Sequence, residues 1–268
     1  MIDWEERPGG IGVITLSRPP VNAFDATSKQ ALHGLLCELD ARTDIRSIVI
    51  RSGLPRTFCA GSDLRELAGE HDQLGVALER TRFEFDMWQR LSSLPQPSIA
   101  AIDGHALGSG LELAVACDFR IAGAGATLGL PEIRIGGAPG IQVLARLSVL
   151  VGLGIATRML LTGDTMSAGE AAAAGLVHEV TPEGAAFEVA ERLALRLAGQ
   201  PRSSVRFLKA SLSATLDASV DRVAAVADDG VEGLFQAPEM HEGIVAFLEK
   251  RQPDFASTVA DRATREAP

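Results

Sequence analysis

The chain lacks an excess of basic residues. Its 25 lysines and arginines are outnumbered by 35 aspartates and glutamates, which gives a formal net charge of −10. Nucleic acids and anionic membranes attract basic surfaces, so this balance argues against a general affinity for either. We therefore expect no nucleic-acid partner and no membrane partner.

Cysteine is also scarce. The three cysteines, Cys37, Cys59 and Cys117, are far apart and odd in number, and no Cys/His spacing typical of zinc is present. We expect buried thiols in a reducing cytoplasm, and no metal site.

Two kinds of hydrophobic segment are missing as well. Residues 1–6 have neither the basic stretch nor the apolar stretch of a signal peptide. No apolar run reaches the roughly 18–20 residues that cross a bilayer, so we expect a cytoplasmic protein.

The residues that are present indicate a globular protein with an α/β core. Apolar residues make up 46% and charged residues 22%, and 268 residues suffice for one large domain. Short apolar runs predict strands at 11–16, 47–50, 98–102 and 118–122. Helical spacing predicts a helix from the Asp25 cap to about residue 40, and another near 75–92. Strands that are apolar on both faces and alternate with helices imply buried sheets.

The character of the chain changes after about residue 140. A strand is expected at 176–180, and helices near 141–161, 167–174, 182–199, 201–215, 217–235 and 238–250. Pro182, Pro201 and Pro238 stand where helices would begin. No linker separates the parts. We therefore predict an α/β core, 1–195, and a C-terminal helical region, 196–268, of the same folding unit.

Two glutamates occupy unusual settings. Glu112 follows a glycine-rich turn at the start of an apolar helix, and Glu132 lies in a Gly/Pro-rich stretch, 129–140. If the fold brings them together, two carboxylates in one pocket could handle one proton and one water. The plainer interpretation of Glu112 is a glutamate that compensates a helix dipole. The dipole lowers its pKa, whereas burial and a second carboxylate raise it.

Two turns could supply backbone donors. Segments 56–64 and 104–112 each place glycine before a helix N-terminus, where backbone N–H groups are unpaired. Two such groups converging on one point would form an oxyanion hole, although the first segment also fits a plain Asp-capped helix. The spacing GxxxGxG does not match GxGxxG, which argues against nicotinamide or flavin cofactors. Nor does it match GxSxG, so we interpret Ser109 as a backbone donor rather than a nucleophile.

Together these segments resemble the enoyl-CoA hydratase/isomerase (crotonase) family from about Ile11 to Phe255. The matching motifs are 17–23, 58–64, 104–118, 131–133 with 139–140, 160–164, 174–177 and 242–251. The resemblance implies a crotonase-like spiral of ββα repeats with a helical C-terminal trimerisation region. It also implies a homotrimer or a dimer of trimers.

The resemblance further implies an acyl-CoA thioester substrate, with coenzyme A as part of the substrate and no separate cofactor. By motif position, the backbone N–H groups of Ser62 and Ser109 form the oxyanion hole, and Glu112 and Glu132 are the catalytic carboxylates. The substrate- and CoA-binding positions are Ala23, Ala60, Asp63, Leu64, Gly108, Pro131, Gly140, Phe247 and Lys250. The last two match C-terminal positions that contact CoA, in some members from a neighbouring subunit.

One residue departs from the family pattern. Ser109 stands where glycine is usual, and a positive φ there would strain serine by about 1 kcal/mol. We expect the turn to accept serine and its Cβ to narrow the acyl pocket. The expected activity is enoyl-CoA hydratase, in fatty acid metabolism. The alternatives are a Δ3-Δ2 enoyl-CoA isomerase, another crotonase-type acyl-CoA lyase, and an inactive or RNA-binding homologue.

Overall fold

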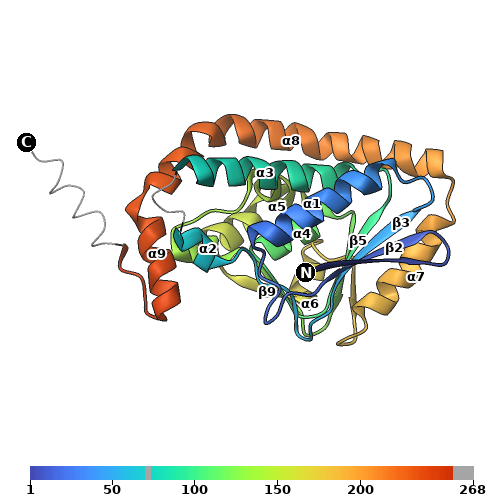
Figure 1. The fold of residues 1–268 in the computed structure, drawn as a ribbon, viewed down its shortest axis with the longest axis horizontal. Helices are drawn as coiled ribbons and strands as arrows, with labels where there is room; N and C mark the ends of the chain where they lie inside the picture. Colours follow the sequence, from blue (N-terminus) through green and yellow to red (C-terminus); the bar gives the residue numbers. More distant parts are fainter. Residues whose placement is uncertain (70–73, 256–268) are drawn as a thin grey trace, which may run out of the picture.

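The computed structural model describes residues 1–69 and 74–255, in which strands and helices alternate as expected (Figure 1). The strands are β1 (Ile2–Arg7), β2 (Ile11–Leu16), β3 (Ser47–Ser52), β4 (Thr57–Cys59), β5 (Ser98–Ile102), β6 (His105–Leu107), β7 (Phe119–Gly123), β8 (Thr127–Gly129), β9 (Thr165–Ser167) and β10 (Glu179–Thr181). The helices are α1 (Ala26–Ala41), α2 (Leu64–Gly69), α3 (Leu74–Ser93), α4 (Ser109–Ala116), α5 (Ile141–Thr162), α6 (Ala168–Ala173), α7 (Ala186–Ala198), α8 (Arg202–Gln236), α9 (Pro238–Glu249) and the 3₁₀ helix η1 (Pro131–Ile135).

The strands form two sheets. The larger has the order β1-β2-β3-β5-β7-β10, with β1 antiparallel to β2 and the other neighbours parallel. The smaller has the order β4-β6-β8-β9, with β9 antiparallel to β8. The pairs β3–β4, β5–β6 and β7–β8 each send one strand to each sheet before a helix follows. The α/β class and the ββα repeats expected from the sequence are therefore confirmed.

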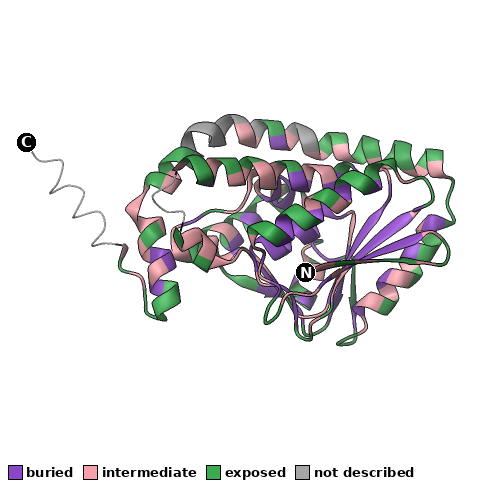
Figure 2. Cartoon of the chain, in the orientation of Figure 1, coloured by how far each residue is buried: buried purple, intermediate pink, exposed green. Residues whose placement is uncertain are grey.

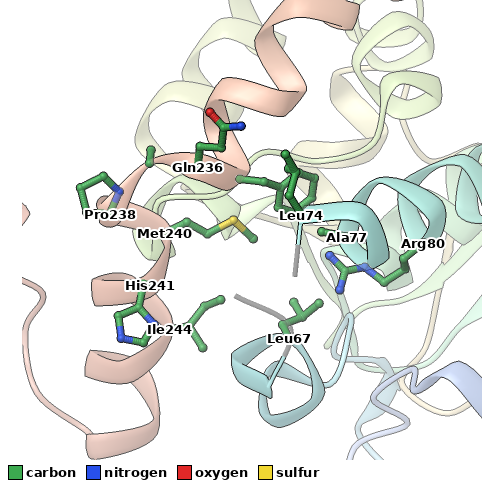
Figure 3. A pocket seen from close by; sticks show the side chains of 11 residues that line it. Leu67, Leu74, Ala77, Arg80, Gln236, Pro238, Met240, His241 and Ile244 are labelled. Carbon is green, nitrogen blue, oxygen red and sulfur yellow. The ribbon is translucent and has the colours of Figure 1, made fainter. Parts of the chain in front are cut away.

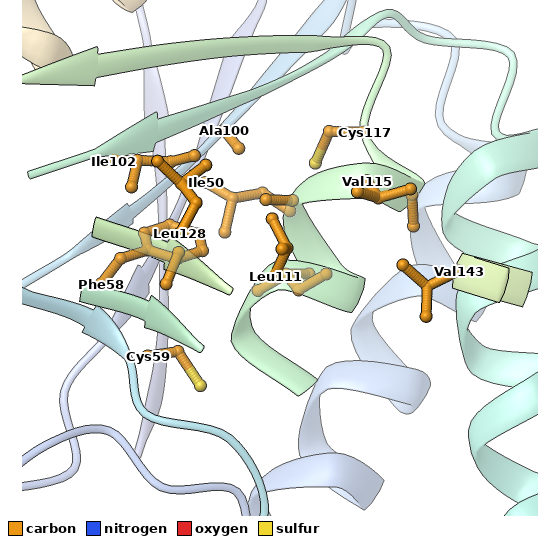
Figure 4. Close-up of a cluster of buried hydrophobic side chains, with 14 of the residues drawn as sticks. Ile50, Phe58, Cys59, Ala100, Ile102, Leu111, Val115, Cys117, Leu128 and Val143 are labelled. Atoms are coloured by element: carbon orange, nitrogen blue, oxygen red, sulfur yellow. The ribbon is translucent and has the colours of Figure 1, made fainter. Parts of the chain in front are cut away.

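The main core surrounds α4. All eight residues of this helix are buried, as expected for a helix that is apolar on every side. Its Leu111 and Val115 lie among side chains of both sheets, including Ile50 and Leu128 (Figure 4). The glutamate in the first turn of α4 is thereby carried into apolar surroundings.

A second core covers the opposite face of the larger sheet. Ala186, Ala190 and Ala194 recur every four residues along α7 and pack on Val49 and Ile99. Successive strand residues point to opposite faces, so the same strands supply both cores. Figure 2 shows the inner strands as largely buried: β5 is buried throughout, and β3 is buried over its first four residues.

The sequence predictions deviate at the C-terminal helices. The helices expected at 201–215 and 217–235 are one helix, α8, because no proline interrupts its 35 residues. α7 begins at Ala186 and not at Pro182, which follows β10 directly and accepts a hydrogen bond from the Ala185 N–H in a turn. The expected two-part organisation stays a prediction, and residues 256–268 of its second part lie outside the described residues.

Two further expectations need correction. α5 is long and apolar enough to cross a membrane, contrary to the expectation that no segment is. In the fold, however, its Val143, Leu147 and Met159 belong to the main core. Cys59 and Cys117 are buried free thiols as expected, but Cys37 is exposed because it lies on the outer side of α1.

Candidate active site

Three neighbouring strands of the smaller sheet bring the two turns and the two glutamates together. β4, β6 and β8 are parallel, so their carboxyl ends lie at the same edge. Ser62 follows β4, Ser109 follows β6, and Glu132 follows β8. The register pairs Leu107 with Gly129, and the Gly108 N–H donates to the Gly129 carbonyl. This pairing places the start of α4 beside η1.

Two glycines allow this close approach. A Cβ on Gly110 would lie 2.2 Å from the Cys59 carbonyl oxygen, so only glycine lets α4 begin against β4. Gly108 has φ 53°, and a Cβ there would lie 3.2 Å from Glu132 Oε1. Ser109 is not among the residues with positive φ, so the turn accepts serine without the strain considered above.

Glu112 is held by two donors. The indole N–H of Trp88 donates to Oε2 at 2.9 Å, and the Gly140 N–H donates to Oε1 at 2.8 Å. The side chain is 5% exposed. Gly140, expected among the substrate-binding residues, thus has a defined contact with a carboxylate.

Glu132 has a different environment. Its Oε2 is buried and has no hydrogen-bond partner among the residues that the structure describes. The residue follows Pro131 in η1, and its carbonyl accepts from the Gly137 N–H at 2.9 Å. A buried carboxylate oxygen without a donor is costly when the group is ionised, so the neutral form of Glu132 is favoured.

Both carboxyl groups have raised pKa values. Burial is the main cause for Glu112, followed by the charge of Glu84, and its pKa rises to about 7 despite the two donors. Burial and then the charge of Glu112 raise the pKa of Glu132 to about 8. Burial therefore outweighs the helix dipole at Glu112, and the two groups titrate close to neutral pH.

The serines of the two turns touch each other. Ser62 Oγ and Ser109 Oγ are 2.9 Å apart. Neither backbone N–H of these serines has an acceptor among the described residues. A Cβ on Gly61 would lie 3.6 Å from Ser109 N, which shows how closely the turns approach. Two unpaired N–H groups beside two carboxyl groups fit a developing oxyanion.

A buried ion pair adjoins the serines, and the sequence motifs did not reveal it. Lys29 is 2% exposed, and its Nζ lies 2.6 Å from Glu84 Oε1 and 3.1 Å from Ser62 Oγ. The sequence could have revealed Lys29 by its position on the apolar stripe of α1, which also carries Leu32 and Leu36. Trp88 was also missed, because its contact with Glu112 spans 24 residues and belongs to no short motif.

A cavity of about 410 Å³ lies between α9 and the helices α2 and α3. Met240 and Ile244 of α9 face Leu67 and Arg80 across it (Figure 3). Arg80, Glu84 and Trp88 recur every four residues and therefore share one face of α3. This face leads from the cavity, past the ion pair, to Glu112 over about 12 Å of helix.

The remaining expected binding residues fall into two groups. Ala23 and Ala60 lie in adjoining segments, 21–24 and 60–63, which exchange backbone hydrogen bonds. Asp63 accepts from Arg18 Nη2 at 3.0 Å, and Leu64 follows it at the start of α2.

The second group lies on α9. Its Gly243 packs against Ile135 of η1, whereas Phe247 and Lys250 are exposed. No cluster of three His, Cys, Asp or Glu side chains that could hold a metal occurs within 1–69 and 74–255. The binding roles of both groups stay predictions.

Known proteins resemble this chain over nearly its whole length. The family model for enoyl-CoA hydratase/isomerase matches residues 6–258. The 2,3-dehydroadipyl-CoA hydratase of Escherichia coli K12 is 38% identical, over 91% of this chain and 94% of that protein. A probable enoyl-CoA hydratase of Mycobacterium bovis is 35% identical, over 93% and 96%. The crystal structure of an enoyl-CoA hydratase from Bacillus anthracis has a TM-score of 0.77 at 32% identity, over 94% and 98%. These likenesses confirm the crotonase-like α/β fold expected from the sequence, whereas the expected trimerisation stays a prediction.

Proposed function

The chain belongs to the enoyl-CoA hydratase/isomerase family, and we propose that it adds water reversibly to a trans-2-enoyl-CoA thioester. The relatives named as hydratases support the reaction class. The observation that carries the proposal is the contrast between the two carboxyl groups. Glu112 is held by two donors, whereas Glu132 Oε2 has no partner among the described residues.

The thioester carbonyl oxygen binds to the backbone N–H groups of Ser62 and Ser109. This polarises the conjugated system and makes the β-carbon electrophilic. Both N–H groups lack an acceptor within the described chain, so the substrate oxygen displaces no internal hydrogen bond. As the negative charge grows on this oxygen, the two donors stabilise it.

Glu112 is the base in this proposal. The Trp88 and Gly140 N–H groups stabilise its ionised form, and its pKa of about 7 leaves it partly ionised and still basic at neutral pH. It takes one proton from the water whose oxygen attacks the β-carbon. The hydroxyl group then stays on the β-carbon.

Glu132 is the acid. Its higher pKa, about 8, keeps it protonated at neutral pH, and it delivers that proton to the α-carbon as the enolate collapses. One water is thus added across the double bond. Glu112 ends protonated and Glu132 ionised, and proton exchange between them or with solvent resets the pair.

The test is loss of the conjugated enoyl thioester absorbance with short-chain trans-2-enoyl-CoA. Glu112→Gln and Glu132→Gln should each lower kcat about 10²–10⁴-fold while the fold is kept. Glu38→Gln, on the exposed side of α1, is the matched control and should keep wild-type turnover. Wild-type rates in either site variant would refute the roles. Conversion of a 3-enoyl-CoA to a 2-enoyl-CoA without hydration would favour the isomerase instead.

A further inference from the structure

A chain of polar side chains leads away from the proposed oxyanion hole. It runs from Ser109 Oγ to Ser62 Oγ (2.9 Å), to Lys29 Nζ (3.1 Å) and to Glu84 Oε1 (2.6 Å). Its members come from four elements: α4, the turn before α2, α1 and α3. We call Lys29, Ser62 and Ser109 the donor wall.

The donor wall has more hydrogens to donate than acceptors to receive them. Lys29 has three N–H donors, and two acceptors, Ser62 Oγ and Glu84 Oε1, are found for them. Ser62 and Ser109 carry two hydroxyl hydrogens, of which their mutual bond uses one. No acceptor among the described residues takes the remaining ammonium and hydroxyl hydrogens. A ligand that fits this wall must therefore accept hydrogen bonds.

The positive charge of Lys29 favours an anionic acceptor over a neutral one. Lys29 brings a cation that is 2% exposed, so solvent screens it little. Glu84 opposes it, and the charge of Lys29 also acts on Glu112. Arg80 Nε lies 3.6 Å from the same Glu84 Oε1 and shares the negative charge of Glu84. A carboxylate accepts hydrogen bonds through both oxygens, donates none, and gains from the ammonium.

The donor wall adjoins the proposed thioester-binding N–H groups. Ser109 supplies the proposed thioester donor through its N–H, and only Cα and Cβ separate that nitrogen from Oγ. Lys29 lies one side chain further on, and Glu84 shares the face of α3 that leads toward the cavity lined by Arg80. The hydroxyl groups of the wall therefore lie within a few bonds of the N–H groups proposed to bind the thioester oxygen.

We propose that the donor wall makes this enzyme selective for enoyl thioesters whose acyl chain carries a carboxylate, with Lys29 as the specificity-determining residue. The proposal rests on the proposed hydratase function. It gives a role to the residue that departs from the family pattern, because the Ser109 hydroxyl is one of the donors.

The experiment compares matched substrates. CoA monothioesters of trans-2-enedioic acids with four, five and six carbons are each paired with the unsubstituted trans-2-enoyl-CoA of equal length. At least one acidic substrate should exceed its partner about tenfold or more in kcat/KM, the effect of one charge-assisted hydrogen bond. A ratio near or below one at all three lengths would overturn the proposal.

Variants of the donor wall test which residues cause the preference for acidic substrates. Lys29→Met combined with Glu84→Met removes the ion pair without leaving a buried charge unpaired, a change that folds often tolerate. The ratio should fall about tenfold in this variant, and Ser109→Ala should lower it in part if the double variant does not fold. Lys209→Met is the control, because Lys209 Nζ lies at the same 2.6 Å from an acidic side chain, that of Asp118. Asp118 keeps its hydrogen bonds from the Ser98 N–H and hydroxyl groups, and the variant should leave the ratio unchanged.

The two proposals fail in different ways. If no enoyl-CoA of either series is hydrated, the hydratase function itself is wrong. If both series are hydrated and the ratio is the same in the wild type and the variants, only the role of the donor wall is refuted.

Discussion

Replacing Glu132 by glutamine should change how the stability of the protein depends on pH. Burial raises the pKa of this carboxyl group from 4.5 to about 8. Between these values the native state holds a proton that the unfolded chain releases, so the free energy of unfolding of the wild type falls as pH rises. Below pH 4.5 both states are protonated, and above pH 8 the loss is complete.

The size of this loss follows from the shift. A rise from 4.5 to about 8 corresponds to on the order of 5 kcal/mol of stability that is lost at alkaline pH. Glutamine has no charge to lose and removes this dependence. Its amide replaces an oxygen that has no partner among the described residues, which adds a cost of about 1–3 kcal/mol at every pH.

The measurement is the free energy of unfolding in chemical denaturant from pH 5.5 to 9, followed by tryptophan fluorescence at fixed protein concentration. Across this range the free energy of unfolding of the variant should rise relative to that of the wild type by on the order of 3 kcal/mol, whatever its starting deficit. Glu38→Gln serves as the control and should run parallel to the wild type. Parallel curves for Glu132→Gln would refute the assignment of a buried, proton-binding carboxyl group.

Three further predictions concern the site and its scaffold. The rate of hydration should show an acidic limb near pH 7, where Glu112 must lose its proton, and an alkaline limb near pH 8 for its partner. Trp88→Phe removes a donor to Glu112 and should move the acidic limb upward in pH; an unmoved limb would contradict the role of the indole. Gly110→Ala should cost more than about 2 kcal/mol in thermal unfolding, because its Cβ meets the Cys59 carbonyl. Gly34→Ala, with nothing within 4 Å, should not destabilise, and equal effects would refute the packing argument.

Much of the local structure could be predicted because its causes are local. Asp25 caps α1 through a capping box with Ser28, as its place before an apolar helical stripe suggests. A glycine just before a predicted helix likewise identified both turns, and it showed that Glu112 lies in the first turn of a helix. Such signals depend on residues within one or two turns of each other, so a single sequence reveals them.

The smaller sheet could not be predicted in the same way. Its strands have three residues each, too few for a periodic pattern, and their pairing depends on register between distant segments. The same limit hid the partners of the site. Lys29 and Glu84 are 55 residues apart, and Trp88 and Glu112 are 24 apart.

Glu112 illustrates which properties of the site the sequence determines and which depend on the tertiary structure. The nine consecutive residues 104–112 suffice to predict the glycine-rich turn and the position of Glu112 at the start of a helix. They also suffice to identify Glu112 as a candidate catalytic residue. They do not determine the sign of its pKa shift, because the dipole and burial act in opposite directions. Burial prevails once α4 passes through the core and η1 is brought alongside it. Residue identity thus determined which groups are available for chemistry, and packing determined their charge, their donors and their distance from one another.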